Sequence, residues 1–489
     1  MILQSTNKIM ALRRATAAAA TNRLIHTATA TSSPPPRTGS SKLARPGGKN
    51  IVLVDAVRTP FLVSGTEYNN LMPHDLARYA LIGLCEKTTL DKSLVDYIVM
   101  GTVIQEVKTS NIAREASIGA GFSDHTPANT VTMACISSNQ AITTCVGLIS
   151  SGVYDVCVAG GVEFMSDVPI RHSRKMRQLM LKASKSKSMG QTLSLLAKIR
   201  PSYLNPELPG IAEFSTGEIM GHSADRLAAS FNVSRAEQDE FALRSHLNAA
   251  RAAEAGLLSD ITPVKPPGSK NIISRDNGIR PSTIQQLAKL KPAFIKPHGT
   301  ITAANASFLS DGASACLITT EEKAKELGWK PKAYLRDFLY VSQDPKDQLL
   351  LGPAYVIPKL LDRAGLSLSD VDVWEIHEAF AGQVLANLRA MDSDFFTKTY
   401  MNRPQGKLGQ IPTDKLNNWG GSLSIGHPFG ATGVRLTAHC ANRLIHEDKQ
   451  IAVLAACAAG GQGVGMIVER HPDAPPLTNK QQQQQSNKN

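Results

Sequence analysis

Short apolar runs alternate with amphipathic stretches along the first third of the chain. The run at 51–60, IVLVDAVRTP, is apolar and rich in β-branched residues, which is typical of a buried strand. Residues 74–88 have helical spacing, and residues 96–105 again predict a strand. Residues 142–152 predict a helix closed by a glycine, and 154–165 predict a strand that runs into glycines. This order of strand, helix and strand predicts an α/β layer fold.

The same pattern returns near the C-terminus. Residues 147–163 (GLISSGVYDVCVAGGVE) have an echo at 440–463 (CANRLIHEDKQIAVLAACAAGGQG): each predicts a helix, a polar break, an apolar strand and a glycine pair. Residues 96–105 have a similar echo at 371–382. The chain of 489 residues is longer than one hydrophobic core normally spans, and two similar α/β halves account for that length.

A segment of different composition separates the two halves. Residues 169–299 are rich in Lys, Pro and Ser and have little strand character, so we expect an inserted loop domain there. The N-terminal half then covers 50–168 and is completed by about 300–325, and the C-terminal half covers 326–470.

The inserted segment contains a strongly basic stretch at 171–200, with nine Lys or Arg and no acid. Its apolar residues have helical spacing in two groups, and Gly190 is the expected turn between two short helices. Such a hairpin suits an anionic membrane surface, but a solvated charged face or a contact with an acidic partner subunit remains open. The apolar residues are Met176, Leu179, Met180, Leu193, Leu196 and Ile199.

The formal net charge of +12 comes mostly from the first 54 residues, which hold eight of the 53 Lys and Arg and no acid. Without them the balance is 45 against 41, so the remainder does not call for a nucleic-acid partner. A basic leader that is rich in Ala, Ser and Thr is typical of a mitochondrial transit peptide, and a disordered tail is the alternative. We expect residues 1–49 to be this transit peptide and a linker.

Two further features limit the class of protein. No window of 18 apolar residues exists, so no transmembrane helix is expected. The seven cysteines are widely spaced and never form a C-x-x-C pair, so neither a disulfide framework nor a metal site is expected, and a reduced compartment such as the mitochondrial matrix fits. The Gln-rich tail at 471–489 is expected to be disordered.

Two cysteines stand in positions suited to chemistry. Cys135 lies where a predicted strand meets a predicted helix, and the positive end of the helix dipole would lower the pKa of its thiol. Cys457 precedes Ala458, Ala459 and a glycine pair, whose backbone N–H groups can form an oxyanion hole. For each cysteine, a buried structural residue is the alternative.

Two histidines are the candidate bases. His377 and Glu378 follow an apolar run and are expected at a strand end, where a structural histidine is the alternative. His427 lies in NNWGGSLSIGHPFGATG, whose glycines imply close approach by another group or a ligand. A nucleophilic cysteine needs a base, and His427 can serve. A second cysteine can move a proton on and off carbon beside a thioester.

Taken together and in this order, four motifs resemble those of the thiolases: Cys135 in a strand-to-helix turn, x-E-A-F, G-H-P-x-G-x-x-G, and a late C-x-x-G-G-x-G. The resemblance runs from about residue 50 to 470. It implies an α/β fold with two similar βαβαβαββ halves in a five-layer α/β/α/β/α arrangement, plus the inserted loop domain. Residues 299–314 also resemble a thiolase segment that lines the coenzyme A site.

Most thiolases have Asn where this chain has His377. In this respect the chain resembles the long-chain 3-ketoacyl-CoA thiolases of mitochondrial fatty acid β-oxidation. The resemblance rests on this histidine and on the stretches PIRHSRKMR, GHSADRLA and YVSQDPKDQLLLGP. The resemblance implies an acetyl-CoA C-acyltransferase with coenzyme A as co-substrate and no permanently bound cofactor. It also implies a homodimer within a complex with an α-subunit that carries hydratase and dehydrogenase activities, on the matrix side of the inner membrane.

The resemblance also assigns catalytic roles. Cys135 would be the nucleophile that becomes the acyl-enzyme, and His427 would take its proton. Cys457 would be the acid/base that protonates the acetyl-CoA enolate and then deprotonates coenzyme A. His427 and His377 would hold the oxygen of the enolate-side thioester.

Three further residues are implied in binding. The backbone N–H groups of Cys135 and Ala459 would hold the second oxyanion, and Ala459 stands where many relatives have Gly. Ser307 and Ala303 match positions that contact the pantetheine arm.

Two other classes of function remain as alternatives. A ketoacyl-synthase-like condensing enzyme would pair its cysteine with two histidines, which His377 and His427 allow, but it would not need Cys457. A non-catalytic lipid-binding or scaffold subunit would not need either cysteine.

Overall fold

The computed structural model describes residues 43–44, 47–210 and 212–477. The chain divides into two units, Met1–Pro46 and Gly47–Asn489, and only residues 43 and 44 of the first are described. Nearly all of the predicted transit peptide and linker, and most of the predicted Gln-rich tail, therefore lie outside the described residues. Over the described ranges, no helix is both long and apolar enough to cross a bilayer.

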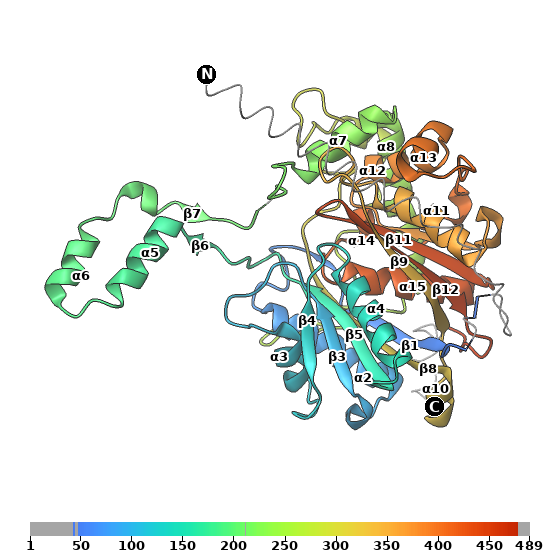
Figure 1. Ribbon diagram of the computed structural model, residues 1–489, viewed down its shortest axis with the longest axis horizontal. Coiled ribbons are helices and arrows are strands. Elements are labelled where there is room, and N and C mark those ends of the chain that lie inside the picture. Colours follow the sequence, from blue (N-terminus) through green and yellow to red (C-terminus); the bar gives the residue numbers. More distant parts are fainter. Residues whose placement is uncertain (1–42, 45–46, 211, 478–489) are drawn as a thin grey trace, which may run out of the picture. The chain divides into compact units, whose positions relative to one another are not determined.

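A single ten-stranded mixed sheet runs through the second unit, in the order β10-β11-β12-β9-β1-β8-β5-β3-β4, with β2 beside β8 (Figure 1). The apolar run that begins at Ile51 forms β1, at the centre of this order, and the strand that the pattern predicted is therefore confirmed. The strands of the N-terminal half are β1 (Ile51–Arg58), β2 (Leu62–Val63), β3 (Tyr97–Gly101), β4 (Ala128–Val131), β5 (Val156–Glu163) and β8 (Ser310–Thr320).

The C-terminal half repeats this topology. Its strands lie in the order β9, β12, β11, β10, which is the order β1, β8, β5, β3 of the first half. A parallel bridge between Trp374 and Leu416 stands where the first half has β4. The two sequence echoes therefore correspond to β5 with β11 and to β3 with β10. The strands are β9 (Ala333–Ser342), β10 (Val373–Ile376), β11 (Ile451–Ala458) and β12 (Gln462–Arg470).

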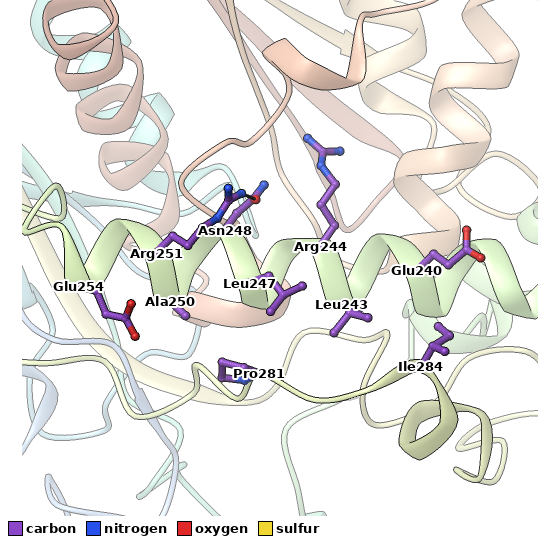
Figure 2. A pocket seen from close by; sticks show the side chains of 10 residues that line it. All are labelled: Glu240, Leu243, Arg244, Leu247, Asn248, Ala250, Arg251, Glu254, Pro281 and Ile284. Atoms are coloured by element: carbon purple, nitrogen blue, oxygen red, sulfur yellow. Dashed lines mark hydrogen bonds between the residues drawn. The ribbon is translucent and has the colours of Figure 1, made fainter.

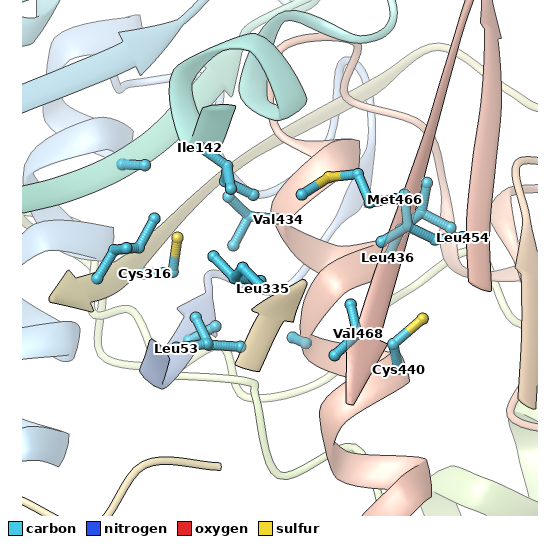
Figure 3. Packing of buried hydrophobic residues seen from close by; sticks show 14 of the residues in the cluster. Leu53, Ile142, Cys316, Leu335, Val434, Leu436, Cys440, Leu454, Met466 and Val468 are labelled. Atoms are coloured by element: carbon cyan, nitrogen blue, oxygen red, sulfur yellow. The ribbon is translucent and has the colours of Figure 1, made fainter. Parts of the chain in front are cut away.

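Two helices form the interior layer. The main hydrophobic cluster joins side chains of α4 (Ser137–Ser150) and α15 (Thr432–His446) to strands of both halves. Figure 3 shows Ile142 of α4 and Val434 of α15 between strands of the two halves. Both helices are buried on several sides, and their apolar residues lie against the strands of both halves, which removes apolar surface from water.

Further helices cover the outer faces of the sheet. On the first half α2 (Pro73–Thr88) and α3 (Ile112–Gly119) pack in a second cluster against β1, β3, β5 and β8. On the second half α11 (Gly352–Ala364) packs on β9, β11 and β12, with α12 (Ala381–Met391) beside it. The two halves of the sheet, which meet where β1 pairs with β9, supply the two β layers. The layers therefore run α/β/α/β/α, and the predicted thiolase-like α/β fold with two similar halves is confirmed.

The inserted segment begins with a helical hairpin. The strand pair β6 (Arg171–His172) and β7 (Pro206–Glu207) closes its base, and α5 (Arg174–Ala183) packs against α6 (Met189–Leu196). Figure 1 shows both helices projecting from the rest of this unit. The prediction of a turn at Gly190 is wrong: the break falls at 184–188, and Ser188 caps α6 so that Gly190 lies inside the helix.

The rest of the inserted segment contacts both halves: its helices pack against the second half, and residues 260–277 lie against the first, where Asp260 and Asp276 bind Arg58. Its main helix, α8, starts with a capping box between Ser234 and Glu237, in which each side chain accepts from the other's backbone N–H. The helices here are α7 (Met220–Ser230), α8 (Arg235–Glu254) and α9 (Ile284–Ala288). The remaining short elements are α10 (Glu321–Glu326), α13 (Asp394–Met401), α14 (Ser422–Ile425), η1 (Lys92–Leu94), η2 (Pro201–Tyr203), η3 (Leu368–Asp370) and η4 (Thr413–Lys415).

Candidate active site

Cys135 lies in the turn between β4 and α4, two residues before the helix begins. Ala134 has a φ of 46°, a left-handed conformation that side chains with a Cβ rarely adopt. The Ser137 hydroxyl holds this turn, since it accepts from Met133 N–H at 2.8 Å and donates to Ala134 O at 2.6 Å. The sequence pattern therefore placed the cysteine correctly, at the junction of strand and helix.

The expected lowering of the Cys135 pKa is wrong. Burial raises the pKa of this thiol to about 12, although the backbone N–H of Ala459 donates to its sulfur and acts in the opposite direction. Desolvation of the thiolate by the surrounding groups outweighs the dipole of α4, although Cys135 is only half-buried. Cys135 is consequently a neutral thiol at rest, and it would have to lose its proton in order to act as a nucleophile.

Cys457 lies one residue before the end of β11, and its side chain is 1% exposed. Burial, with the neighbouring Cys135 thiol, raises its pKa well above the ordinary value. Gly460 and Gly461 follow in the hairpin turn to β12 with φ values of 82° and 69°. Their positive φ, and the 2.6 Å between a Cβ at Gly461 and Gln343 O, account for these glycines without any ligand.

His427 is held by two hydrogen bonds. Its backbone N–H donates to Ser310 Oγ at 2.9 Å, and its Nδ1 lies 2.7 Å from Thr432 Oγ1 in the first turn of α15. Its Nε2 is buried and has no hydrogen-bond partner among the described residues. Burial, followed by the charge of Arg435, lowers the pKa of His427 to about 3, so the ring is neutral.

His377 follows β10 directly, as the apolar flank predicted, and is completely buried. Its ring lies 4.0 Å from that of His427 between centroids, and its Nδ1 lies 2.9 Å from Ser422 Oγ. Its Nε2 also lacks a partner in the described part of the chain. Burial, His427 and Arg435, in that order, lower its pKa well below the ordinary value.

Glu163, at the end of β5, ties the loop of His427 to the opposite wall. Its carboxylate accepts the N–H groups of Gly430 at 3.0 Å, Ile104 at 2.9 Å and Val103 at 3.2 Å. Burial raises its pKa to about 7, against the effect of these three donors. No sequence pattern predicts this role, because its three backbone donors lie far from Glu163 along the chain and meet it only in the fold.

The glycines around His427 do allow close approach, but the approaching groups belong to the protein. A Cβ at Gly421 would lie 2.2 Å from the carboxyl carbon of Glu378, and one at Gly433 would lie 2.3 Å from Asn139 Oδ1. A Cβ at Gly430 would meet Val162 O at 2.4 Å. The prediction of close contact is confirmed, and the approaching groups are Glu378 of the same half and Val162 and Asn139 of the other half, so these glycines serve tight packing within the protein.

A cavity of about 770 Å³ joins most of the predicted site residues. Cys135, His427, Cys457 and Ala459 all line it. They arrive from four separate places: the β4–α4 turn, the loop before α15, the end of β11 and the β11–β12 hairpin. Its apolar wall includes Met165, Phe294, Phe308, Leu350 and Phe380.

Of the other predicted site residues, one lines the cavity and two do not. Ser307 lines the cavity, and its backbone N–H donates to Ala379 O at 2.9 Å. Ala303 is exposed and does not line it. His377 lies behind His427 rather than on the cavity wall.

A second groove of about 830 Å³ runs along α8, where Leu243, Leu247 and Ala250 face Pro281 and Ile284 (Figure 2). Although it is slightly larger, none of the residues that line it is a cysteine or a histidine. The cavity that contains Cys135 and Cys457 is therefore the candidate active site.

Family models match nearly the whole folded chain. Residues 51–322 match the thiolase N-terminal domain, and residues 329–470 match the thiolase C-terminal domain.

Named relatives are similar over most of their length. The chain is 67% identical over 430 residues to the human "Trifunctional enzyme subunit beta, mitochondrial", covering 88% of this chain and 90% of that protein. It is 63% identical over 433 residues to the "Probable 3-ketoacyl-CoA thiolase" of Caenorhabditis elegans, covering 88% and 96%. The crystal structure of human mitochondrial 3-ketoacyl-CoA thiolase in complex with CoA superposes with a TM-score of 0.73 at 30% identity, covering 86% of this chain and 98% of that one.

Proposed function

The chain belongs to the thiolase family, and from this premise we propose that it is a 3-ketoacyl-CoA thiolase, which uses coenzyme A to cleave a 3-ketoacyl-CoA into acetyl-CoA and a shortened acyl-CoA. One observation carries the proposal: two thiols, Cys135 and Cys457, line one cavity together with His427, whose Nε2 has no partner among the described residues. A nucleophile, a base and a separate proton carrier are the groups that this reaction needs.

In the first half-reaction the Cys135 sulfur attacks the 3-keto carbon, and its proton passes to His427 Nε2. The bond between C2 and C3 of the substrate then breaks, the acyl group stays on Cys135, and the electron pair forms the enolate of acetyl-CoA. Cys457 gives its proton to C2 of the enolate and becomes a thiolate. The raised pKa of Cys457 suits this step, because the thiol is protonated when the enolate forms.

In the second half-reaction the Cys457 thiolate takes the proton of coenzyme A. The coenzyme A thiolate attacks the acyl carbon, and Cys135 leaves and recovers its proton from His427. Every group has then returned to its starting state, so the two half-reactions balance in atoms, protons and electrons.

Two oxyanions need donors. The backbone N–H of Ala459 acts to lower the pKa of the Cys135 thiol, which supports a role for this N–H and that of Cys135 beside the acyl oxygen. Once His427 carries the Cys135 proton, its Nε2–H can donate to the thioester oxygen of the enolate. We assign His377 as the second donor there, directly or through a water molecule.

The finer assignments come from the similarity to the relatives and from the sequence. We propose long-chain substrates, the matrix side of the mitochondrial inner membrane, and a homodimer in complex with an α-subunit carrying hydratase and dehydrogenase activities. Ser307 and Ala303 would contact the pantetheine arm of coenzyme A, and the hairpin of α5 and α6 would contact the membrane. The domain division at 50–168, 169–299 and 326–470 belongs to the same proposal.

The test is coenzyme A-dependent cleavage of 3-ketohexadecanoyl-CoA by the chain purified with its α partner. We expect the wild type to release acetyl-CoA, and Cys135→Ala and Cys457→Ala to lose turnover by roughly 10³-fold or more. Cys316→Ala is the matched control, because this thiol is buried in β8 away from the cavity and should leave turnover unchanged.

The variants also separate the rival functions. A Cys457→Ala variant that retained nearly full thiolysis would favour the condensing-enzyme hypothesis. A wild type that bound 3-ketohexadecanoyl-CoA without cleaving it would favour a lipid-binding subunit. Trapped acyl-enzyme on Cys135, detected by mass spectrometry of the intact chain, would support the proposed nucleophile.

A further inference from the structure

The two site histidines are hydrogen-bonded in opposite senses. His427 Nδ1 lies 2.7 Å from Thr432 Oγ1, and the Thr432 hydroxyl lies 3.0 Å from Pro428 O, a carbonyl that can only accept. The Thr432 hydroxyl therefore donates its hydrogen to Pro428 O. Thr432 Oγ1 then accepts from the ring, so His427 Nδ1 carries the hydrogen of that bond. The proton of this neutral ring is on Nδ1, so Nε2 has a free lone pair.

The arrangement around His377 is the reverse. Arg435 Nη2 donates to Ser422 Oγ at 2.9 Å, and a guanidinium can only donate. Within the described residues, the structure gives Ser422 Oγ one other partner, His377 Nδ1 at 2.9 Å. The hydroxyl hydrogen of Ser422 thus points to His377 Nδ1, and the proton of this ring lies on Nε2.

In the other tautomer of His377, the Ser422 hydroxyl hydrogen would have no acceptor among the described residues. If Nδ1 carried the proton, Ser422 Oγ would accept from both sides and its own hydrogen would have no partner. Ser422 and His377 are completely buried and Arg435 is 1% exposed, so water does not replace the missing acceptor. The Nδ1 tautomer would thus leave two buried groups without a partner among the described residues, the Ser422 hydroxyl hydrogen and His377 Nε2, whereas the Nε2 tautomer leaves only the Nε2–H. Because each unpaired buried polar group is costly, the difference favours the Nε2 tautomer.

We propose that Arg435 and Ser422 are positioning residues that hold His377 with its proton on Nε2, so that it donates to an oxyanion beside a His427 that Thr432 holds as an acceptor. The inference rests on the proposed thiolase function and deepens it. It gives two adjacent histidines different tasks: His427 removes a proton, and His377 presents one in a hydrogen bond.

Arg435 is well placed to act as a fixed donor. It lies in α15, the interior helix, and its Nη1 is 3.6 Å from Glu375 Oε2 at the end of β10. Arg443, two turns further along α15, binds Glu375 Oε1 at 2.8 Å. The carboxylate is thereby held from two sides, and the guanidinium of Arg435 keeps its orientation toward Ser422.

A double-mutant cycle tests the inference by its kinetics. Ser422→Ala should lower kcat for thiolysis roughly tenfold with KM for coenzyme A unchanged within about twofold, because the tautomer of His377 is no longer fixed. His377→Asn replaces the ring by an amide whose nitrogen always carries hydrogens. In that background Ser422→Ala should change kcat by less than about twofold.

Ser424→Ala is the matched control. Ser424 lies on the same short helix and is equally buried, but its hydroxyl contacts Ser245 and the backbone of Gly421 instead of a histidine. We expect it to keep its kcat. An equal loss in Ser422→Ala and Ser424→Ala, or a Ser422→Ala effect that persists in the His377→Asn background, would overturn the inference in favour of a structural role.

Nitrogen NMR of the wild-type chain labelled with ¹⁵N-histidine decides the point without relying on Ser422→Ala folding. We expect His377, assigned by its loss in His377→Asn, to show a protonated Nε2 and an unprotonated Nδ1, and His427 to show the reverse. The opposite pattern at His377 would overturn the inference. Failure of the proposed function would look different, since the wild type would then cleave no 3-ketohexadecanoyl-CoA whatever its tautomers.

Discussion

The imidazole rings of His377 and His427 lie 4.0 Å apart between centroids, with their planes at 43°. Two positive charges at this separation in a buried site would repel strongly, and Arg435 adds a third charge. Both rings are therefore neutral, and each has one unpaired Nε2 among the described residues. The arrangement keeps a base available at pH values where a free histidine would already be protonated.

A first prediction concerns the pH dependence of acylation. Because the pKa of His427 is about 3, the ring stays neutral well below pH 6.5. The burst of acetyl-CoA released from 3-ketohexadecanoyl-CoA without coenzyme A should keep a constant rate between about pH 5 and 8. Stopped-flow measurement of this burst avoids the titration of the coenzyme A thiol, and an inflection near pH 6.5 would contradict the prediction.

The same shift predicts a pH dependence of stability. In the unfolded chain His427 takes up a proton as the pH falls below about 6.5, whereas in the folded chain it does not until about pH 3. The free energy of unfolding should therefore fall as the pH falls from 6.5. Urea titrations at pH 7 and 5 should show a smaller fall for His427→Gln than for the wild type, whereas His125→Gln, at a side chain that is 95% exposed, should match the wild type.

Thr432→Val should impair the base. The valine keeps the shape of threonine but removes the acceptor of His427 Nδ1–H, so the proton is free to move to Nε2 and block it. We expect the acylation rate to fall roughly tenfold. Thr437→Val is the control, since Thr437 is equally buried in α15 and binds only Gly433 O; equal losses in both variants would mean that the hydroxyl acts through helix stability.

Gly421→Ala should destabilise the fold. Its Cβ would lie 2.2 Å from the carboxyl carbon of Glu378, a buried side chain that is fixed by Ser245 and Asn417. We expect a loss of about 2–3 kcal/mol in the free energy of unfolding. Gly147→Ala is the matched control, because nothing lies within 4 Å of its Cβ and it sits in the interior of α4; this variant should gain about 0.5–1 kcal/mol.

The hairpin of α5 and α6 should bind anionic vesicles. It carries basic residues and exposed apolar side chains, including Leu193 at 62% and Leu181 at 63% exposure. In co-sedimentation, the chain with its α partner should bind vesicles that contain anionic lipid and lose most of this binding in Leu181→Ser/Leu193→Ser. Val153→Ser, at another exposed apolar residue, should bind as the wild type does. Equal binding by the wild type and both variants would contradict a membrane contact through α5 and α6.

The sequence alone determined the strands and the repeat, and it predicted the residues that we propose to carry the chemistry. Apolar runs such as 51–58 and 451–458 can only be buried, and their order limits which of them pair in each half. Cys135, His427 and Cys457 stood out because reactive side chains beside turns and glycines are seldom needed for packing alone. These properties are local, or they are repeated along the chain, and local patterns are what a sequence shows directly.

Tertiary structure alone decided how those residues behave. The pKa of the Cys135 thiol is raised rather than lowered, because desolvation by the groups around it outweighs the nearby helix dipole. The turn of the hairpin falls before Gly190, because Ser188 supplies a cap. The tautomer of His427 depends on Thr432, and that of His377 depends on Ser422 and on Arg435, which donates to Ser422 only in the folded chain. Burial and hydrogen-bond direction depend on neighbours in space, and a linear sequence does not specify which neighbours those are.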